Sequence, residues 1–160
     1  MNTIKLIRRM LILQFSIHLK IGLIMITEDY CSFEVAKLLK EKGFDELCIF
    51  KYNSEGVRMK AGAAIDEWQN SELDDDECSC VSLQMAMKWL REKGFHINAS
   101  VSYDYSEDAD GNIVDKWTFW LFEIFSSFGG DIIYTEEVNE YDSYEEAVEA
   151  ALKYCLENLI

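Results

Sequence analysis

The stretch from His96 to Ser126, HINASVSYDYSEDADGNIVDKWTFWLFEIFS, decides the fold that we expect for this chain of 160 residues. In its first ten residues, apolar side chains alternate with polar ones, which predicts a half-buried strand. The pair Asp110-Gly111 is a hairpin-turn signal. Residues Lys116 to Ser126 are apolar on both faces, which is typical of a central strand. We therefore expect a β-hairpin whose second strand lies inside a sheet, with the aromatic residues of that strand in the core: Trp117, Phe119, Trp120 and Phe122.

Three helices are expected, each beginning after a serine that can cap it. The serines are Ser32, Ser82 and Ser143, and each precedes a segment with apolar residues at helical spacing. The first two helices are expected to end at Gly43 and Gly94, because glycine often follows the last helical residue. The three starts look alike, which common capping rules or a duplicated helix–strand unit would explain.

The last helix has the strongest signal. Ser143 and Glu146 have the spacing of a capping box, in which hydroxyl and carboxylate each accept from a backbone N–H of the first turn. Glu149 and Lys153 are expected to form an i,i+4 ion pair on its polar side. Its apolar stripe comprises Ala147, Val148, Ala151, Leu152, Cys155, Leu156 and Leu159.

Three further strands are expected: Leu47–Tyr52, then Val57–Lys60 after an intervening turn, and a third within Asp131–Val138. Residues 61–72 give no clear signal. The order of elements predicts an α+β class: a single domain over residues 25–160, with a mainly antiparallel sheet and about three helices packed on one face.

The charge is unevenly distributed along the chain. The formal net charge is −15, but residues 1–24 contain four basic and no acidic side chains, so residues 25–160 carry a net −19. A domain this acidic is expected to repel nucleic acid, whose recognition needs a basic surface. A strong negative charge also keeps proteins in solution, which is the plainer explanation of this composition.

The basic, apolar leader of residues 1–24 has three interpretations. It resembles a secretory signal, although no small-residue cleavage site follows it. It could be an appended or interfacial helix. It could also be upstream sequence, with Met25 as the true start. The uncharged run between Met10 and Leu19 is shorter than the ~20 residues that span a bilayer, so we expect no membrane association.

Five cysteines, an odd number without a disulfide-type spacing, favour the reducing cytoplasm. Cys48 and Cys155 are expected in the core. Cys78 and Cys80 are expected in an acidic loop, where neighbouring carboxylates raise thiol pKa values. A zinc site there would need two more nitrogen or sulfur ligands, and His96 is the sole candidate outside the leader. We expect neither a metal nor another cofactor.

Catalytic motifs are sparse. His96 is the one histidine of residues 25–160, so a histidine-dependent enzyme would rest on it together with carboxylates. Ser106, Asp108 and Asp110 partly follow a calcium-loop pattern, but Trp117 stands where that loop has its bidentate glutamate. A hairpin turn explains the same residues.

Three segments resemble those of a family of small uncharacterised acidic proteins from gut-bacterial genomes, prophages and mobile elements. They are SFEVAKLLKEKGFDE at 32–46, QMAMKWLRE at 84–92 and YEEAVEAALK at 144–153. The resemblance covers most of residues 25–160 and none of the leader. It implies a cytoplasmic accessory protein, brings no catalytic residue, and supports Met25 as the start.

Three functions follow as hypotheses. The first is a non-enzymatic accessory protein that binds another protein, and the acidic charge favours a basic partner. The second is an acidic mimic of nucleic acid that inhibits a DNA-acting enzyme. The third is a small enzyme using His96 with carboxylates. The candidate binding surface is acidic, and it would be continuous if the loops that carry it share one sheet edge. It comprises Asp74, Asp75, Asp76, Glu77, Glu107, Asp108 and Asp110. The sequence does not determine the partner or the oligomeric state.

Overall fold

The computed structural model describes residues 27–60 and 67–160. Predictions about the leader, and about residues 61–66, lie outside the described residues. The described part contains three α-helices and a short 3-10 helix: α2 (Phe33–Glu41), η1 (Asn70–Glu72), α3 (Leu83–Glu92) and α4 (Tyr144–Asn158). Its strands are β1 (Phe50–Tyr52), β2 (Arg58–Lys60), β3 (Cys78–Ser79), β4 (Phe95–Glu107), β5 (Ile113–Ser126) and β6 (Ile132–Thr135).

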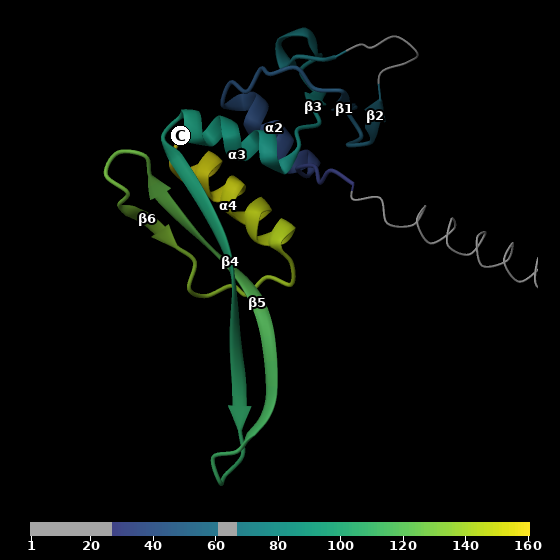
Figure 1. The fold of residues 1–160 in the computed structure, drawn as a ribbon. Coiled ribbons are helices and arrows are strands. Elements are labelled where there is room, and N and C mark those ends of the chain that lie inside the picture. The colour runs from purple at the N-terminus through teal and green to yellow at the C-terminus, as the bar shows by residue number, and fades with distance from the viewer. Residues whose placement is uncertain (1–26, 61–66) are drawn as a thin grey trace, which may run out of the picture.

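The α+β class with antiparallel pairing is confirmed. The strands divide into two three-stranded sheets, with the orders β2-β1-β3 and β4-β5-β6. β5 is the central strand of the second sheet, as its two-sided apolar pattern predicts. Helix α4 packs on β4 and β5, α3 packs on β4, and α2 lies between α4 and β3 (Figure 1). The helices therefore separate the small sheet from the large one.

The helix boundaries follow the predicted caps. Ser32, Ser82 and Ser143 each accept a hydrogen bond from the backbone N–H three residues later, at 3.2, 3.4 and 3.2 Å. Gly43 and Gly94 follow the ends of α2 and α3 with φ of +86° and +97°. This left-handed conformation strains residues that carry a Cβ, which explains why glycine stands at both ends.

The capping box of α4 is shifted by one residue. Ser143 Oγ accepts from the Glu146 N–H, but the Glu146 carboxylate reaches back to the N–H of Asp142 at 3.1 Å rather than to that of Ser143. The backbone N–H groups of Asp142 and Glu146 both have an acceptor, so the arrangement still stabilises the start of the helix.

The predicted ion pair between Glu149 and Lys153 is wrong. Lys153 Nζ contacts Glu34 Oε1 at 2.7 Å, and Glu149 Oε1 accepts from the Ser32 N–H at 2.8 Å. Both side chains therefore link α4 to the first turn of α2, a contact over more than a hundred residues that local spacing does not reveal.

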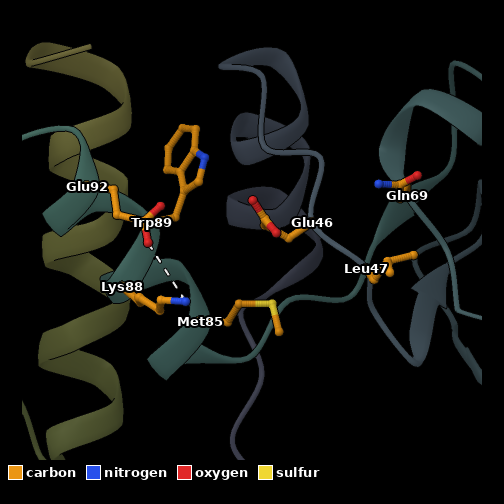
Figure 2. A pocket seen from close by; sticks show the side chains of 7 residues that line it. All are labelled: Glu46, Leu47, Gln69, Met85, Lys88, Trp89 and Glu92. Carbon is orange, nitrogen blue, oxygen red and sulfur yellow. Dashed lines mark ion pairs between the residues drawn. The ribbon is translucent and has the colours of Figure 1, made fainter.

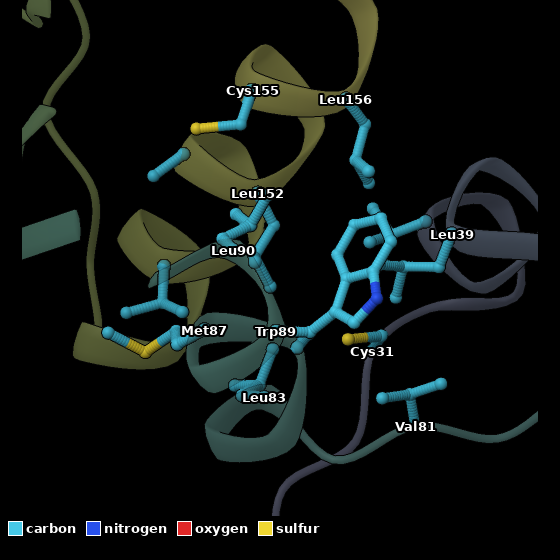
Figure 3. Packing of buried hydrophobic residues seen from close by; sticks show 14 of the residues in the cluster. Cys31, Leu39, Val81, Leu83, Met87, Trp89, Leu90, Leu152, Cys155 and Leu156 are labelled. Carbon is cyan, nitrogen blue, oxygen red and sulfur yellow. The ribbon is translucent and has the colours of Figure 1, made fainter. Parts of the chain in front are cut away.

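The hydrophobic core lies where the three helices meet the second sheet. Figure 3 shows Trp89 of α3 close to Leu39 of α2, with side chains of α4 alongside. Cys48 and Cys155 are buried, as predicted. Burying a leucine or phenylalanine side chain contributes roughly 1.5–3 kcal/mol. The largest fully buried side chains are Phe44, Phe122, Leu39, Leu90, Ile124, Leu152 and Leu156.

Several strand boundaries differ from the prediction. β1 begins at Phe50, because Cys48 instead forms an isolated two-bond bridge with Trp68 (2.9 and 2.8 Å), and the flanking Leu47 and Ile49 are exposed. β5 begins at Ile113, three residues before the expected Lys116. Among the described helices, none has the length and apolar content that crossing a membrane requires.

Candidate binding surface

The hairpin of β4 and β5 extends beyond the helices as a free arm (Figure 1). The two strands pair from Phe95↔Ser126 to Glu107↔Ile113. Fourteen residues of β5 extend about 46 Å at 3.3 Å per residue. Fifteen residues of α4 extend only about 22 Å at 1.5 Å per residue. The helix therefore covers one end of the hairpin, and we call the uncovered part, residues 101–118, the arm.

Both faces of the arm expose apolar side chains. On the face that continues from the core, Val101 is 60% and Tyr103 71% exposed, whereas Phe122 on the same face within the body is buried. On the opposite face Trp117 is 40% exposed. Its predicted core position is wrong, because Trp117 lies on the sheet face opposite the one on which the helices pack. Such contiguous exposed apolar residues are typical of interaction sites.

The end of the arm is a tight turn held by Asp108. Its Oδ1 accepts hydrogen bonds from the N–H groups of Asp110 and Asn112 at 2.9 and 2.8 Å. Hydrogen bonds from the Asn112 backbone and then its side chain lower the pKa of Asp108. Gly111 has a φ of +83°. The predicted hairpin turn is thus present, and it accounts for the residues of the calcium-like pattern.

The predicted acidic residues fall into two groups. Glu107, Asp108 and Asp110 lie exposed at the tip of the arm. Residues 74–77 lie before β3, at the other end of the molecule (Figure 1). The structure therefore does not bring the two groups to one sheet edge, since residues 74–77 precede strand β3 of the small sheet and the tip belongs to the large one. The length of the hairpin separates the two groups, and the order of the loops in the sequence does not indicate this separation.

The loop of Asp74 to Glu77 is fastened to the body. Lys40 Nζ donates to the carbonyl oxygens of Asp74 and Glu77 at 2.6 and 2.8 Å. Glu77 Oε2 also pairs with Lys51 Nζ at 2.6 Å. The other three acidic residues of the loop, Asp74, Asp75 and Asp76, are exposed. One of the four carboxylates, that of Glu77, is therefore committed to an ion pair within the body.

Glu136, in the acid-rich segment after β6, is buried and structural. Its carboxylate accepts from the N–H groups of Val138 and Asn139 and from the hydroxyl of Tyr134. Burial by itself raises the pKa of Glu136, but these hydrogen bonds outweigh burial and hold the pKa below its usual range.

Cys78 begins strand β3 and Cys80 follows it, and both are buried, so their predicted place in an acidic loop is wrong. Burial raises the pKa of Cys78 to about 11, while Lys40 and Lys37 act in the opposite direction and Glu77 adds little. Desolvation, rather than neighbouring acids, therefore keeps this thiol protonated. No group of three metal-ligating side chains occurs within residues 27–60 and 67–160.

His96 is exposed near the start of β4, directly across from Phe125. It makes no hydrogen bond or ion pair with another residue of the described ranges. Its nearest polar pair across the strands is Asn98 and Glu123, which bind each other at 3.2 Å. The arrangement lacks the oriented base–acid contact that characterises histidine-dependent sites.

The body also has a shallow cavity of about 340 Å³ between α3 and the segment before β1 (Figure 2). Trp89 and Met85 form its apolar wall. An exposed ion pair between Lys88 and Glu92, at 3.8 Å, lies on its rim. The cavity gathers no nucleophile, so we assign it no chemistry.

Comparison with known proteins identifies no relative: no family model, no curated protein and no solved structure matches this chain.

The candidate binding residues that the sequence analysis did not identify are the exposed aromatic side chains of the arm. One signal was available. The alternating pattern continues to Tyr105, and a hairpin that long cannot be covered by a helix of the length that residues 143–159 allow.

Proposed function

We propose that this chain is a non-enzymatic accessory protein that binds a basic protein partner through the arm. The observation that carries the proposal is the combination of exposed aromatic side chains with carboxylates on one projection. Tyr103 and Trp117 supply apolar contact area, and Asp104 lies directly opposite Trp117 in the strand pairing. Aromatic residues dominate the energetics of many protein interfaces.

Charge supports a basic partner. Residues 25–160 carry a net −19, and three of the acidic residues in that total, Glu107, Asp108 and Asp110, lie exposed at the tip. Acidic surfaces steer basic partners during diffusion and speed their association. The same field repels phosphate, so we expect no direct binding to nucleic acid at physiological salt.

A narrower form of the proposal is that the partner is a DNA-acting enzyme whose basic groove receives the arm. The long acidic projection favours it. A role in phage or mobile-element biology and a cytoplasmic location are part of the same proposal. They are supported by the resemblance described above and by five free, buried thiols, which suit a reducing compartment.

Capture from bacterial lysate on the immobilised full chain tests the proposal. Two variants alter the arm: Trp117→Ser, and the double change Glu107→Gln with Asp110→Asn. Two controls alter matched exposed residues elsewhere: Phe128→Ser, and Asp75→Asn with Asp76→Asn. We expect both arm variants to lose capture and both controls to retain it.

Salt and the identity of the captured proteins complete the test. Capture should weaken between low and moderate salt, because exposed charges are screened beyond ~8 Å at physiological ionic strength. Equal capture by arm and control variants, or capture unchanged at ~0.5 M salt, contradicts the proposal. Enrichment of basic DNA-acting enzymes supports the narrower form, and varied basic proteins support the broader one.

A further inference from the structure

The outer edge of β4 is an unpaired strand edge. β4 is the first strand in the order β4-β5-β6, so one side of it faces no other strand. In the antiparallel pairing, backbone groups of alternate residues point toward the partner strand and away from it. Trp120 of β5 exchanges both of its backbone hydrogen bonds with Tyr141, on the side away from β4. Its cross-strand neighbour Val101 therefore also points its N–H and C=O outward.

The outward-pointing residues of β4 thus include Ile97, Ala99, Val101, Tyr103 and, nearer the tip, Tyr105. Of these, the Tyr105 N–H is already occupied by the Asp104 carboxylate at 2.7 Å. On the other edge of the arm, Asp115 occupies the Lys116 N–H in the same way at 2.8 Å. Carboxylates that cap outward N–H groups hinder the addition of another strand.

The segment from Ala99 to Tyr103 lacks this protection. Within the described residues, the outward N–H and C=O groups of Ala99, Val101 and Tyr103 have no backbone partner. The segment contains no proline, lysine or bulge, the usual devices that keep strand edges apart. The edge is therefore open over a stretch bounded by a carboxylate cap.

We propose that this edge pairs with β4 of a second copy of the chain, antiparallel and centred on Val101. Such pairing joins two three-stranded sheets into one continuous sheet about a two-fold axis. It forms about six new N–H···O=C bonds, because each of the three outward residues exchanges both of its groups. A two-fold contact of this kind is closed, so association stops at the dimer.

The side chains fit this register. Val101 meets its own copy, and each Tyr103 meets the small Ala99 of the other chain. Asp104 meets Asn98, an amide that can donate to a carboxylate. Cross-strand pairs that can hydrogen-bond stabilise a sheet, whereas like charges placed opposite each other destabilise it. No carboxylate faces a carboxylate over the paired stretch.

Charge complementarity continues beyond the strands. Antiparallel pairing carries the acidic tip of one arm, with Glu107 and Asp108, toward the start of β4 in the other chain. α3 ends immediately before that point with the exposed basic residues Arg91 and Lys93. In the dimer, basic side chains of one copy therefore lie near the acidic tip of the other, although each chain is strongly acidic overall. The faces of the arm with Trp117, and the outer edge of β5, remain open to another partner.

Disulfide trapping tests the register in the otherwise unchanged chain. Paired residues in this geometry have Cα atoms about 5.5 Å apart, within disulfide range. Val101→Cys should therefore form an intermolecular disulfide under mild oxidation, since the five native thiols are buried. Ser102→Cys alone should not, because its copy lies diagonally at about 7–8 Å. A mixture of Ser100→Cys and Ser102→Cys chains should form the mixed disulfide.

Mass measurement of the purified full chain, without any partner, supplies the second test. At about 100 µM the particle should have twice the chain mass of 18.6 kDa if the dissociation constant is micromolar. Val101→Lys should reduce it to the monomer by placing two lysines side by side, and far-UV circular dichroism should show that this exposed substitution leaves the fold intact. Thr118→Lys, the same change one strand away on the same face, should leave the dimer unchanged.

The possible results distinguish the dimer from the partner-binding proposal. A monomeric wild-type chain at this concentration overturns the inference, as does a failure of Val101→Cys to cross-link. Equal trapping of Ser102→Cys and Val101→Cys also overturns it, because the register is then wrong. Loss of the dimer without loss of partner capture, or the reverse, leaves the other proposal standing, since the dimer is measured on the protein alone.

Discussion

Asn70 Oδ1 accepts a hydrogen bond from the backbone N–H of Ser79 at 2.8 Å, while Asn70 Nδ2 donates to the Phe44 carbonyl oxygen at 2.7 Å. Asn70 is 5% exposed, and both bonds are buried. One side chain therefore joins the segment that follows α2 to strand β3, which begins at the buried Cys78. It is the polar anchor of the small sheet.

Replacing this side chain should destabilise the fold. Asn70→Ala leaves a buried N–H and a buried carbonyl without partners, each of which costs about 1–3 kcal/mol. We expect the free energy of unfolding, measured by urea denaturation, to fall by at least ~2 kcal/mol. Asn98→Ala, the same change at an exposed asparagine on β4, is the control and should stay within ~0.5 kcal/mol of wild type. Similar losses in both variants would mean that the buried bonds contribute little.

The buried thiols should make the protein sensitive to alkali. Burial raises the pKa of Cys155 from 9.0 to about 12 and that of Cys78 to about 11. Above pH 9 the unfolded chain loses these protons while the folded chain keeps them, so stability falls as pH rises between 9 and about 12. Each such thiol contributes up to ~1.4 kcal/mol per pH unit. Urea denaturation at pH 8 and pH 10.5 should show the fall.

A variant isolates one thiol. Cys155→Ala is less stable than wild type at pH 8, because it leaves a cavity in the core. Its further loss between pH 8 and pH 10.5 should nevertheless be smaller than that of wild type, because one titrating group is gone. An identical pH slope in both proteins would show that Cys155 does not titrate as its burial implies.

We predict that Cys78 and Cys80 hold no structural zinc. Both thiols are buried and protonated, because burial raises their pKa values, and zinc binds thiolates. Elemental analysis of protein purified without chelator should find well under one zinc per chain. Stoichiometric zinc that disappears in the double variant Cys78→Ser/Cys80→Ser would refute the prediction.

A chain that begins at Met25 should fold as well as the full chain. The residues of the described core all lie between positions 31 and 159, and most belong to the helices and the second sheet. We expect thermal melts of the two proteins to correspond to stabilities within ~1–2 kcal/mol, the usual threshold of a meaningful change. A larger loss on truncation would mean that residues 1–24 dock on the body.

Local chemistry made much of the fold predictable. The helix caps are local: a serine hydroxyl can accept a hydrogen bond from the backbone N–H three residues later without any tertiary contact. This is the interaction made by Ser32, Ser82 and Ser143. The hairpin turn followed from Asp110-Gly111 for the same reason. Asn70 escaped prediction, because its partners lie 26 and 9 residues away and no periodicity marks it.

The candidate surface was only partly predictable. Glu107, Asp108 and Asp110 were identified, but their separation from Asp74–Glu77 depends on the length of the arm. Trp117 was assigned to the core because an apolar residue in an apolar strand usually lies there. What exposes it is its position on the sheet face opposite the helices, which a strand with apolar residues on both faces does not reveal.

The exposure of Trp117 also gives the arm its own optical signal. The other described tryptophans, Trp68, Trp89 and Trp120, are buried or half-buried, whereas Trp117 is 40% exposed and lies opposite Asp104. Cationic and anionic quenchers of fluorescence should therefore act on Trp117 to different extents. Caesium, drawn to the nearby carboxylates, should quench its emission more than iodide, which they repel. The fluorescence of one indole thus reports on whatever comes to cover the arm, without an added label.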